Sequence, residues 1–194
     1  MYYIRKATVS DISTIYNFTH NLVQYHEGMK DYFILNEEAL LIAFQNNAFE
    51  CLILFENLKD KEEAVGYLLY MEEYSFLHGN GYFVDDFFVT SNLRGKGLGK
   101  MLMHYLYELA ITESRNFVKL IFQKSILGLE NLYTGLGFVN ITAPESGLSI
   151  YELFGEMEIK HFFDTFQVDN TENKEKFNEN DFFYIIKRQE KGIS

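Results

Sequence analysis

Residues 82–100 read YFVDDFFVTSNLRGKGLGK, and this stretch decides the fold. Its first part, residues 82–89, is rich in aromatic and β-branched residues, which is typical of a buried strand. Its last part, residues 94–100, alternates glycines with basic residues before an apolar repeat at helical spacing begins. That repeat consists of Leu98, Met101, Leu102, Tyr105 and Leu109. The stretch therefore predicts a strand, a glycine loop and a helix in succession.

The flanking sequence extends this unit into a mixed α/β (α+β) domain. Residues 117–124 form a second buried-looking strand, so that residues 82–124 predict a parallel crossover. Helix starts are indicated at Ser10 with Asp11 and at Asn36, where short polar side chains precede apolar repeats. Further strands are expected at 2–6, 50–56, 64–74 and 149–154, with a turn at 57–63 and a last helix at 126–136 capped by Gly137.

The length and composition indicate one main domain. A chain of 194 residues exceeds the usual domain size of about 100–150 residues only modestly. We assign residues 1–163 to a single domain and residues 164–194 to a C-terminal extension. The extension is partly solvated, because residues 169–181 are rich in Asn, Glu and Lys, whereas residues 182–187 could add a strand or pack on the body.

The charge excludes some classes of partner. With 17 basic and 28 acidic residues the net charge is -11, which argues against binding to nucleic acids or to an anionic membrane. The single cysteine, Cys51, rules out a disulfide scaffold, and the five histidines are too scattered to predict a metal site. Neither a signal peptide nor an apolar run of about 20 residues is present, so we expect a cytoplasmic protein.

The glycine loop has the chemistry of a phosphate site. Glycines let the backbone turn tightly and aim its N–H groups outward, and the positive end of the helix dipole lies behind them. The spacing fits neither the P-loop nor the dinucleotide fingerprint. By itself the loop is therefore equally compatible with a simple turn and with an anion site.

Arg94-x-x-Gly97-x-Gly99, preceded by the strand at residues 85–89, resembles the acetyl-CoA-binding motif of the GCN5-related N-acetyltransferase (GNAT) superfamily. Within it, the chain looks most like the spermidine/spermine (diamine) N-acetyltransferases. The likeness covers residues 3 to about 155 and includes Asn131-Leu132-Tyr133 followed by Gly137-Phe138. It implies a GNAT fold, with a central mixed twisted sheet of about six to seven strands and about four flanking helices. It also implies a homodimer.

The resemblance assigns roles to residues of this chain. The backbone of Phe87 to Val89 would hold the pantetheine arm, residues 95–100 would take the pyrophosphate, and Tyr133 would meet the CoA sulfur. The implied cofactor-binding residues are Phe87, Phe88, Val89, Arg94, Gly95, Lys96, Gly97, Leu98, Gly99, Lys100 and Tyr133. The implied catalytic residues are Tyr133 and Asp85, and the implied substrate-binding residues are Asp85, His26, Glu27 and Glu145. No metal is implied.

Elementary chemistry fits these roles. An alkyl ammonium with a pKa of about 10.4 must lose a proton before its nitrogen can attack a thioester, and a carboxylate can accept that proton directly or through a water. Asp85 and Asp86 should alternate faces on a strand, so only one of them can point into a given site. The resemblance places Asp85 there, and we expect Asp86 to have a structural partner. Tyr133 could donate a proton or a hydrogen bond to the leaving thiolate, and the Val89 N–H could stabilise the oxyanion.

The chain also departs from the family pattern. At Ile126 it lacks an asparagine that helps to bind CoA in relatives, and Asp85 is one methylene shorter than the family glutamate, which favours a bridging water. Ser75 replaces an acidic residue of the polyamine enzymes, although Glu72 and Glu73 lie nearby. A polycationic amine would be favoured if Asp85, Glu27, Glu72, Glu73 and Glu145 converge.

We therefore expect an enzyme that moves acetyl from acetyl-CoA to a primary amine of a polyamine or diamine, a small molecule, by direct attack on the thioester. One alternative is the same chemistry on an amino acid, a thialysine-like compound or a protein N-terminus. A second alternative is a non-catalytic module that binds acyl-CoA or another partner.

Overall fold

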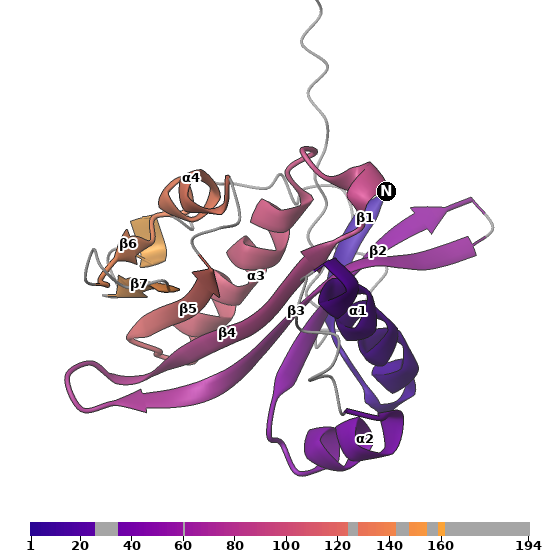
Figure 1. Cartoon of the computed structure of the whole chain (residues 1–194), viewed down its shortest axis with the longest axis horizontal. Helices are drawn as coiled ribbons and strands as arrows, with labels where there is room; N and C mark the ends of the chain where they lie inside the picture. Colours follow the sequence, from indigo (N-terminus) through magenta and orange to yellow (C-terminus); the bar gives the residue numbers. More distant parts are fainter. Residues whose placement is uncertain (26–34, 60, 124–127, 143–147, 155–158, 162–194) are drawn as a thin grey trace, which may run out of the picture.

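The computed structural model describes residues 1–25, 35–59, 61–123, 128–142, 148–154 and 159–161. Within these ranges a seven-stranded sheet has the order β1-β2-β3-β4-β5-β7-β6 (Figure 1). The strands are β1 (Tyr2–Lys6), β2 (Glu50–Leu58), β3 (Lys61–Ser75), β4 (Gly79–Val89), β5 (Phe117–Gln123), β6 (Val139–Asn140) and β7 (Leu148–Phe154). The α-helices are α1 (Ile12–Tyr25), α2 (Glu37–Gln45), α3 (Leu98–Thr112) and α4 (Leu129–Thr134). None of the helices described is both long and apolar enough to cross a membrane.

The sheet is mixed, as the sequence predicts. Strands β4 and β5 are parallel, and the other neighbouring pairs are antiparallel. Helix α3 connects the parallel pair, which confirms the crossover expected over residues 82–124. A parallel connection of this kind brings the start of the helix back to the carboxyl end of the first strand.

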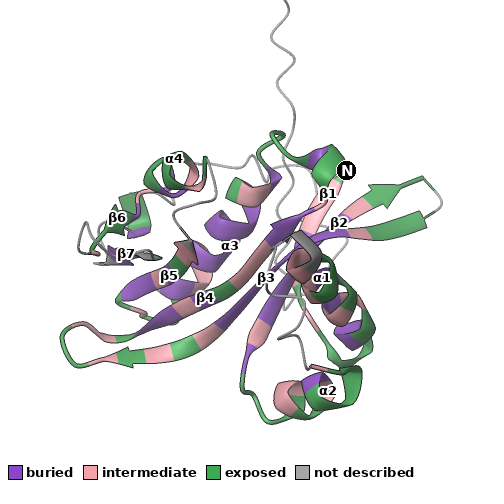
Figure 2. Cartoon of the chain, in the orientation of Figure 1, coloured by how far each residue is buried: buried purple, intermediate pink, exposed green. Residues whose placement is uncertain are grey.

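Two hydrophobic cores cover the two faces of the sheet. In β2, Leu52 and Leu54 pack in the core that contains α3, whereas Cys51, Ile53 and Phe55 pack in the core that contains α1 and α2. This alternation follows from the two-residue period of a strand. The end of the β3–β4 hairpin that projects from the body is largely exposed or half-buried in Figure 2. The cores therefore hold the sheet between α3 and the α1–α2 pair.

The helix starts are partly as predicted. Asn36 caps α2 as expected, because its side-chain oxygen accepts a hydrogen bond from the Ala39 N–H at 2.8 Å. The expected cap at Ser10 is wrong. Thr8 occupies that position, because the Asp11 carboxylate turns back to accept the Thr8 N–H at 2.7 Å, and a short 3-10 turn at Val9–Asp11 precedes α1.

Some strand and helix limits also differ. The expected turn at residues 57–63 is shorter, since β2 continues to Leu58 and β3 begins at Lys61. The last helix begins only at Leu129, after Gly128 at a φ of 88°. The two-residue strand β6 was not predicted because so short an exposed segment has no periodic pattern. The extension at 164–194, with its expected strand at 182–187, lies outside the described residues.

Candidate active site

The parallel strands β4 and β5 are paired up to Val84 and separate from Asp85 onward. Their pairing runs from Gly81 with Phe117 to Val84 with Leu120, and no later pair is formed among the described residues. Beyond that point β4 continues along β3 as far as Val89, and β5 continues along β7. Asp86 to Val89 therefore pair on one edge only, which leaves the edge toward β5 able to bind an extended ligand.

A β-bulge falls at the same place. On β3, Tyr70 pairs with Val84 and its neighbour Leu69 pairs with Asp86, so Asp85 is the extra residue. Val84 and Phe87 lie three positions apart yet both pack against the α3-side core. The alternation assumed for the two aspartates is thus interrupted. It fails here because an inserted residue shifts the phase of all side chains that follow.

The two aspartates have different surroundings. Asp85 is exposed as a residue, yet partial desolvation raises the pKa of its carboxyl. Asp86 is half-buried and accepts a hydrogen bond from the Tyr67 hydroxyl at 2.7 Å. The structural partner expected for Asp86 is thereby confirmed. A carboxylate that is accessible and has a raised pKa is suited to accept a proton, so Asp85 is the better candidate for a base.

The glycine loop follows β4 after a short 3-10 turn at Ser91–Leu93 and ends at the first turn of α3. Gly95 and Gly97 have φ values of 75° and 83°, which side chains with a Cβ rarely adopt. Gly97 is the N-cap of α3, and its carbonyl accepts the Met101 N–H at 3.1 Å. The N–H groups of the first helical turn have no partner within the helix, so they can serve an anion. Lys96 and Lys100 are exposed beside them.

Arg94 ties the loop back to β4. Its Nε donates to the Val89 carbonyl at 3.0 Å, and its guanidinium carbon lies 5.4 Å from the centre of the Phe88 ring. Phe88 and Val89 are buried, and Phe87 is half-buried. The strand proposed for pantetheine and the loop proposed for pyrophosphate are therefore adjacent and connected through one side chain.

Tyr133 lies on α4, against the end of β5 that diverges from β4. Its ring centre is 5.1 Å from that of Phe122, which is two residues beyond Leu120, the last β5 residue paired with β4. The rings of Phe138 and Tyr151 complete the cluster around Tyr133. Burial raises the pKa of Tyr133 to about 12, so the hydroxyl keeps its proton at neutral pH. Asp85 and Tyr133 thus belong to the two sides of the separation between β4 and β5.

The expected convergence of acidic residues does not extend to β3. Glu72 forms an ion pair with Arg115, and Glu73 forms one with Lys119. Both glutamates lie opposite the part of β4 that still pairs with β5, before the strands separate. Because the charges of Glu72 and Glu73 are matched by Arg115 and Lys119, the condition that these glutamates converge with Asp85 is not met. The other predicted residues, His26, Glu27, Glu145 and Ile126, lie outside the described residues.

Two residues beside the site were missed. Tyr67 and Thr19 bond each other, at 3.1 Å between the two hydroxyl oxygens, and Tyr67 also bonds Asp86. Nothing in the sequence distinguishes Tyr67 among 14 tyrosines. Its position opposite Phe88, within reach of Asp86, depends on strand register, which only the folded chain defines.

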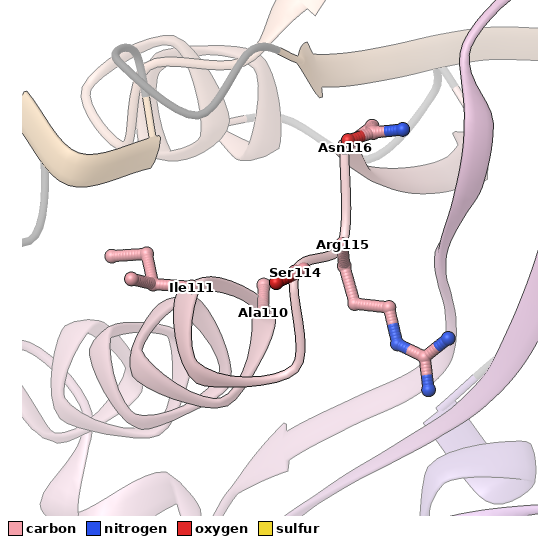
Figure 3. Close-up of a pocket in the computed structure, with 5 residues that line it drawn as sticks. All are labelled: Ala110, Ile111, Ser114, Arg115 and Asn116. Carbon is pink, nitrogen blue, oxygen red and sulfur yellow. The ribbon is translucent and has the colours of Figure 1, made fainter.

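A small pocket lies elsewhere, at the end of α3 away from the glycine loop (Figure 3). It is lined by Ala110, Ile111, Ser114, Arg115 and Asn116. Its position at the C-terminus of α3 separates it from the glycine loop at the N-terminus. Within the described ranges no group of three His, Cys, Asp or Glu side chains could hold a metal ion.

Comparisons with known proteins agree with this geometry. The model of the acetyltransferase (GNAT) family matches residues 10–138. A thialysine N-epsilon-acetyltransferase from Bos taurus is 28% identical over 159 residues, which are 79% of this chain and 92% of that protein. The human spermidine/spermine N(1)-acetyltransferase-like protein 1 is 29% identical over 150 residues, which are 73% of this chain and 21% of that protein.

Solved structures show the same fold. The structure of yncA from Salmonella typhimurium, solved with its cofactor acetyl-CoA, superposes with a TM-score of 0.61 at 20% identity and covers 78% of this chain and 92% of that one. The family match spans the strand, the glycine loop, α3 and Tyr133. The chain belongs to the acetyltransferase (GNAT) family and is an acetyl-CoA-dependent N-acetyltransferase.

Proposed function

We propose that the enzyme transfers acetyl from acetyl-CoA to a primary amine of a diamine or polyamine. The observation that carries this proposal is the position of Asp85, the extra residue of a bulge where β4 leaves β5. A carboxylate there can attract an ammonium group and then accept its proton. Because Asp85 is accessible, a long alkyl amine can reach it from solvent.

The cofactor would lie along β4 and the glycine loop. The pantetheine arm would pair with the edge of Phe87 to Val89 that faces away from β3, as a peptide pairs with an edge strand. The pyrophosphate would lie on the first turn of α3, where the N–H groups, Lys96 and Lys100 supply positive charge. This arrangement directs the thioester toward the separation between β4 and β5.

The reaction then follows in balanced steps. A proton passes from the ammonium to Asp85, directly or through a water, and the free nitrogen attacks the thioester carbonyl. The new C–N bond forms as the C–S bond breaks, the electron pair leaves on sulfur, and the second proton that the nitrogen loses as it becomes an amide passes to solvent or to the leaving thiolate. Tyr133 hydrogen-bonds that sulfur. Since its pKa is about 12, against about 8.5 for a thiol, Tyr133 stabilises the thiolate as a hydrogen-bond donor rather than by giving up its proton.

The preferred amine is the finer part of the proposal. A second candidate is a thialysine-like amino acid, which the similarity to the Bos taurus enzyme favours. Both classes present a primary amine on a flexible chain, so the same base serves both. They differ at the far end, where a polyamine carries a second cation and an amino acid carries a carboxylate.

An amine panel tests the proposal. Purified protein and acetyl-CoA are mixed with spermidine, putrescine, thialysine, lysine or an N-terminal peptide, and release of free CoA thiol is followed with a chromogenic reagent. The proposal expects the highest kcat/KM with a diamine or polyamine. A preference for thialysine would establish the second candidate, and tight acetyl-CoA binding without thiol release would establish a non-catalytic module. Sedimentation of the same sample tests the proposed homodimer.

A further inference from the structure

Two hydrogen bonds link three side chains in series, from α1 to the β-bulge. Thr19 on α1 bonds Tyr67 on β3, and Tyr67 bonds Asp86 on β4, at 3.1 and 2.7 Å between the respective oxygens. Asp86 is the residue directly after Asp85, and it pairs with Leu69 at the register shift. This hydrogen-bonded series therefore ends beside Asp85, the proposed base.

The direction of the hydrogen bonds follows from proton counting. A carboxylate only accepts, so the single hydroxyl proton of Tyr67 is donated to Asp86. Thr19 must then donate its own proton to the Tyr67 oxygen. Burial, and next the nearby charge of Asp86, raise the pKa of Tyr67 well above its usual value, so this donor is present at every physiological pH. A hydrogen bond to an ionised acceptor is stronger than a neutral one.

Aromatic packing fixes the tyrosine in place. Its ring is fully buried and stacks on Phe18 of α1, with the ring centres 5.3 Å apart and the planes 9° apart. Phe18 also contacts Phe88 of β4, at 5.8 Å between ring centres. The same helix thus holds the rings on both strands that flank the bulge, and the Tyr67 hydroxyl has little freedom to leave Asp86.

The bulge needs such support. An inserted residue disrupts the ladder locally, so the backbone around it has fewer hydrogen bonds than a regular strand. On the edge toward β5, no strand pairing with β5 continues after Val84 among the described residues. A side-chain bond from Tyr67 to Asp86 restrains the backbone at the point where ladder bonds are weakest.

We infer that Tyr67 is a positioning residue of the acetyl transfer, which holds the bulge through Asp86 so that Asp85 faces the attacking amine. This inference rests on the proposed role of Asp85. It assigns to Tyr67 and Thr19 a part in catalysis without any contact to substrate. The effect should therefore appear in kcat rather than in the binding of acetyl-CoA.

The test compares two tyrosine variants. Tyr67→Phe removes the donor to Asp86 and keeps the ring stacked on Phe18. Tyr70→Phe is the matched control, because Tyr70 is equally buried on the same strand but donates to Glu50, at 3.0 Å, on the opposite face. Steady-state rates are measured with the best amine of the panel, together with the KM for acetyl-CoA and the melting temperature.

We expect Tyr67→Phe to lower kcat about tenfold with the KM for acetyl-CoA changed less than about twofold. Tyr70→Phe should lower the melting temperature by a similar amount and leave kcat near the wild-type value. Equal kcat values in the two variants would overturn the inference. Wild-type inactivity with every amine would instead refute the proposed function, so the two failures are distinguishable.

A second variant, Thr19→Val, tests the inference if Tyr67→Phe does not fold. Thr19→Val removes the donor to the Tyr67 oxygen and leaves the Tyr67–Asp86 bond without its outer partner. The inference expects a smaller decrease in kcat, about threefold, again with an unchanged KM for acetyl-CoA. An unchanged kcat in Thr19→Val, with Tyr67→Phe unfolded, would reject the positioning role.

Discussion

The ring of Phe87 lies where a side chain on Gly99 would begin. A Cβ added to Gly99 would be 2.9 Å from the Phe87 Cζ, which is closer than such contacts allow. Phe87 belongs to the last part of β4, and Gly99 to the first turn of α3. The strand and the helix on either side of the glycine loop thus touch across it, and this contact fixes how the first turn of α3 is presented.

Gly99→Ala should weaken acetyl-CoA binding. The added methyl group displaces the Phe87 ring, at a cost of about 1 kcal/mol, and shifts the first turn of α3 relative to β4. We expect the KM for acetyl-CoA to rise about threefold to tenfold. Steady-state kinetics at a saturating amine concentration measure this change.

Gly81→Ala is the matched control for Gly99→Ala. Its Cβ would meet the Phe117 ring at 2.5 Å, at the other end of the same strand. Because Phe117 is fully buried, Gly81→Ala should lose more stability than Gly99→Ala but keep the wild-type KM. An equal rise of KM in both variants would mean that general loosening, and not the loop, weakens binding.

Asp85→Ala should remove most of the activity. A positioned general base contributes at least about a hundredfold, so we expect kcat/KM to fall by about that factor. Glu72→Gln is the control, since that carboxylate is paired with Arg115. A rate in Asp85→Ala close to that of Glu72→Gln would exclude Asp85 as the base.

The pH dependence gives a second signature of Asp85. Desolvation raises its pKa above the usual value near 3.9, and the base acts only when deprotonated. The rate per free amine should therefore fall as the pH decreases through this raised pKa. In Asp85→Ala that acidic limb should be absent. If the acidic limb persists in Asp85→Ala, it arises from the titration of another group.

Tyr133→Phe should lower kcat about tenfold to a hundredfold, the value of one hydrogen bond to a charged group. Because burial raises the pKa of Tyr133 to about 12, the wild-type enzyme should show no basic limb from this residue below about pH 11. The profiles of Tyr133→Phe and wild type should thus run parallel between pH 7 and 10. A wild-type limb in this range that the variant lacks would show that Tyr133 titrates during turnover.

The elements around the site were predictable from sequence because they are encoded locally. The strand at 82–89, the loop at 94–100 and the helix that starts at Leu98 each have their own periodicity, and together they fix a parallel crossover. The same pattern brings the loop to the end of β4. Local patterning therefore predicted where the strand, the glycine loop and the helix meet.

The bulge at Asp85 was not predictable in this way. It depends on the register between β3 and β4, which is set by side chains from residues 66 to 89 acting together. The same register brings Tyr67 to Asp86 and takes Glu72 and Glu73 away from the site. Fine placement of the catalytic groups thus comes from long-range pairing, for which the sequence carries no local signal.

The start of α1 depends on one partly buried ion pair. Asp11 accepts two hydrogen bonds from the Arg5 guanidinium, at 2.7 and 2.8 Å, and one from the Thr8 N–H. Burial alone would raise the pKa of Asp11, but the bonds from Arg5 and Thr8 outweigh it, and the net pKa is lowered. A lowered pKa stabilises the fold above the unfolded-state pKa near 3.9 and loses that effect as the pH falls through the folded-state value.

Asp11→Asn should therefore destabilise the protein by about 2–3 kcal/mol at pH 7 in urea unfolding, because Arg5 loses its charged partner. The difference from wild type should shrink as the pH falls below about 4, where the wild-type carboxyl also begins to lose its charge. Glu63→Gln is the control, since its pair with Lys61, at 3.2 Å, is exposed and should change stability by less than about 0.5 kcal/mol. A difference that stays undiminished as the pH falls to the acid limit of folding would show that packing, and not the ion pair, holds the start of α1. Because α1 also carries Thr19, loss of this anchor should also lower kcat, whereas Glu63→Gln should leave kcat unchanged.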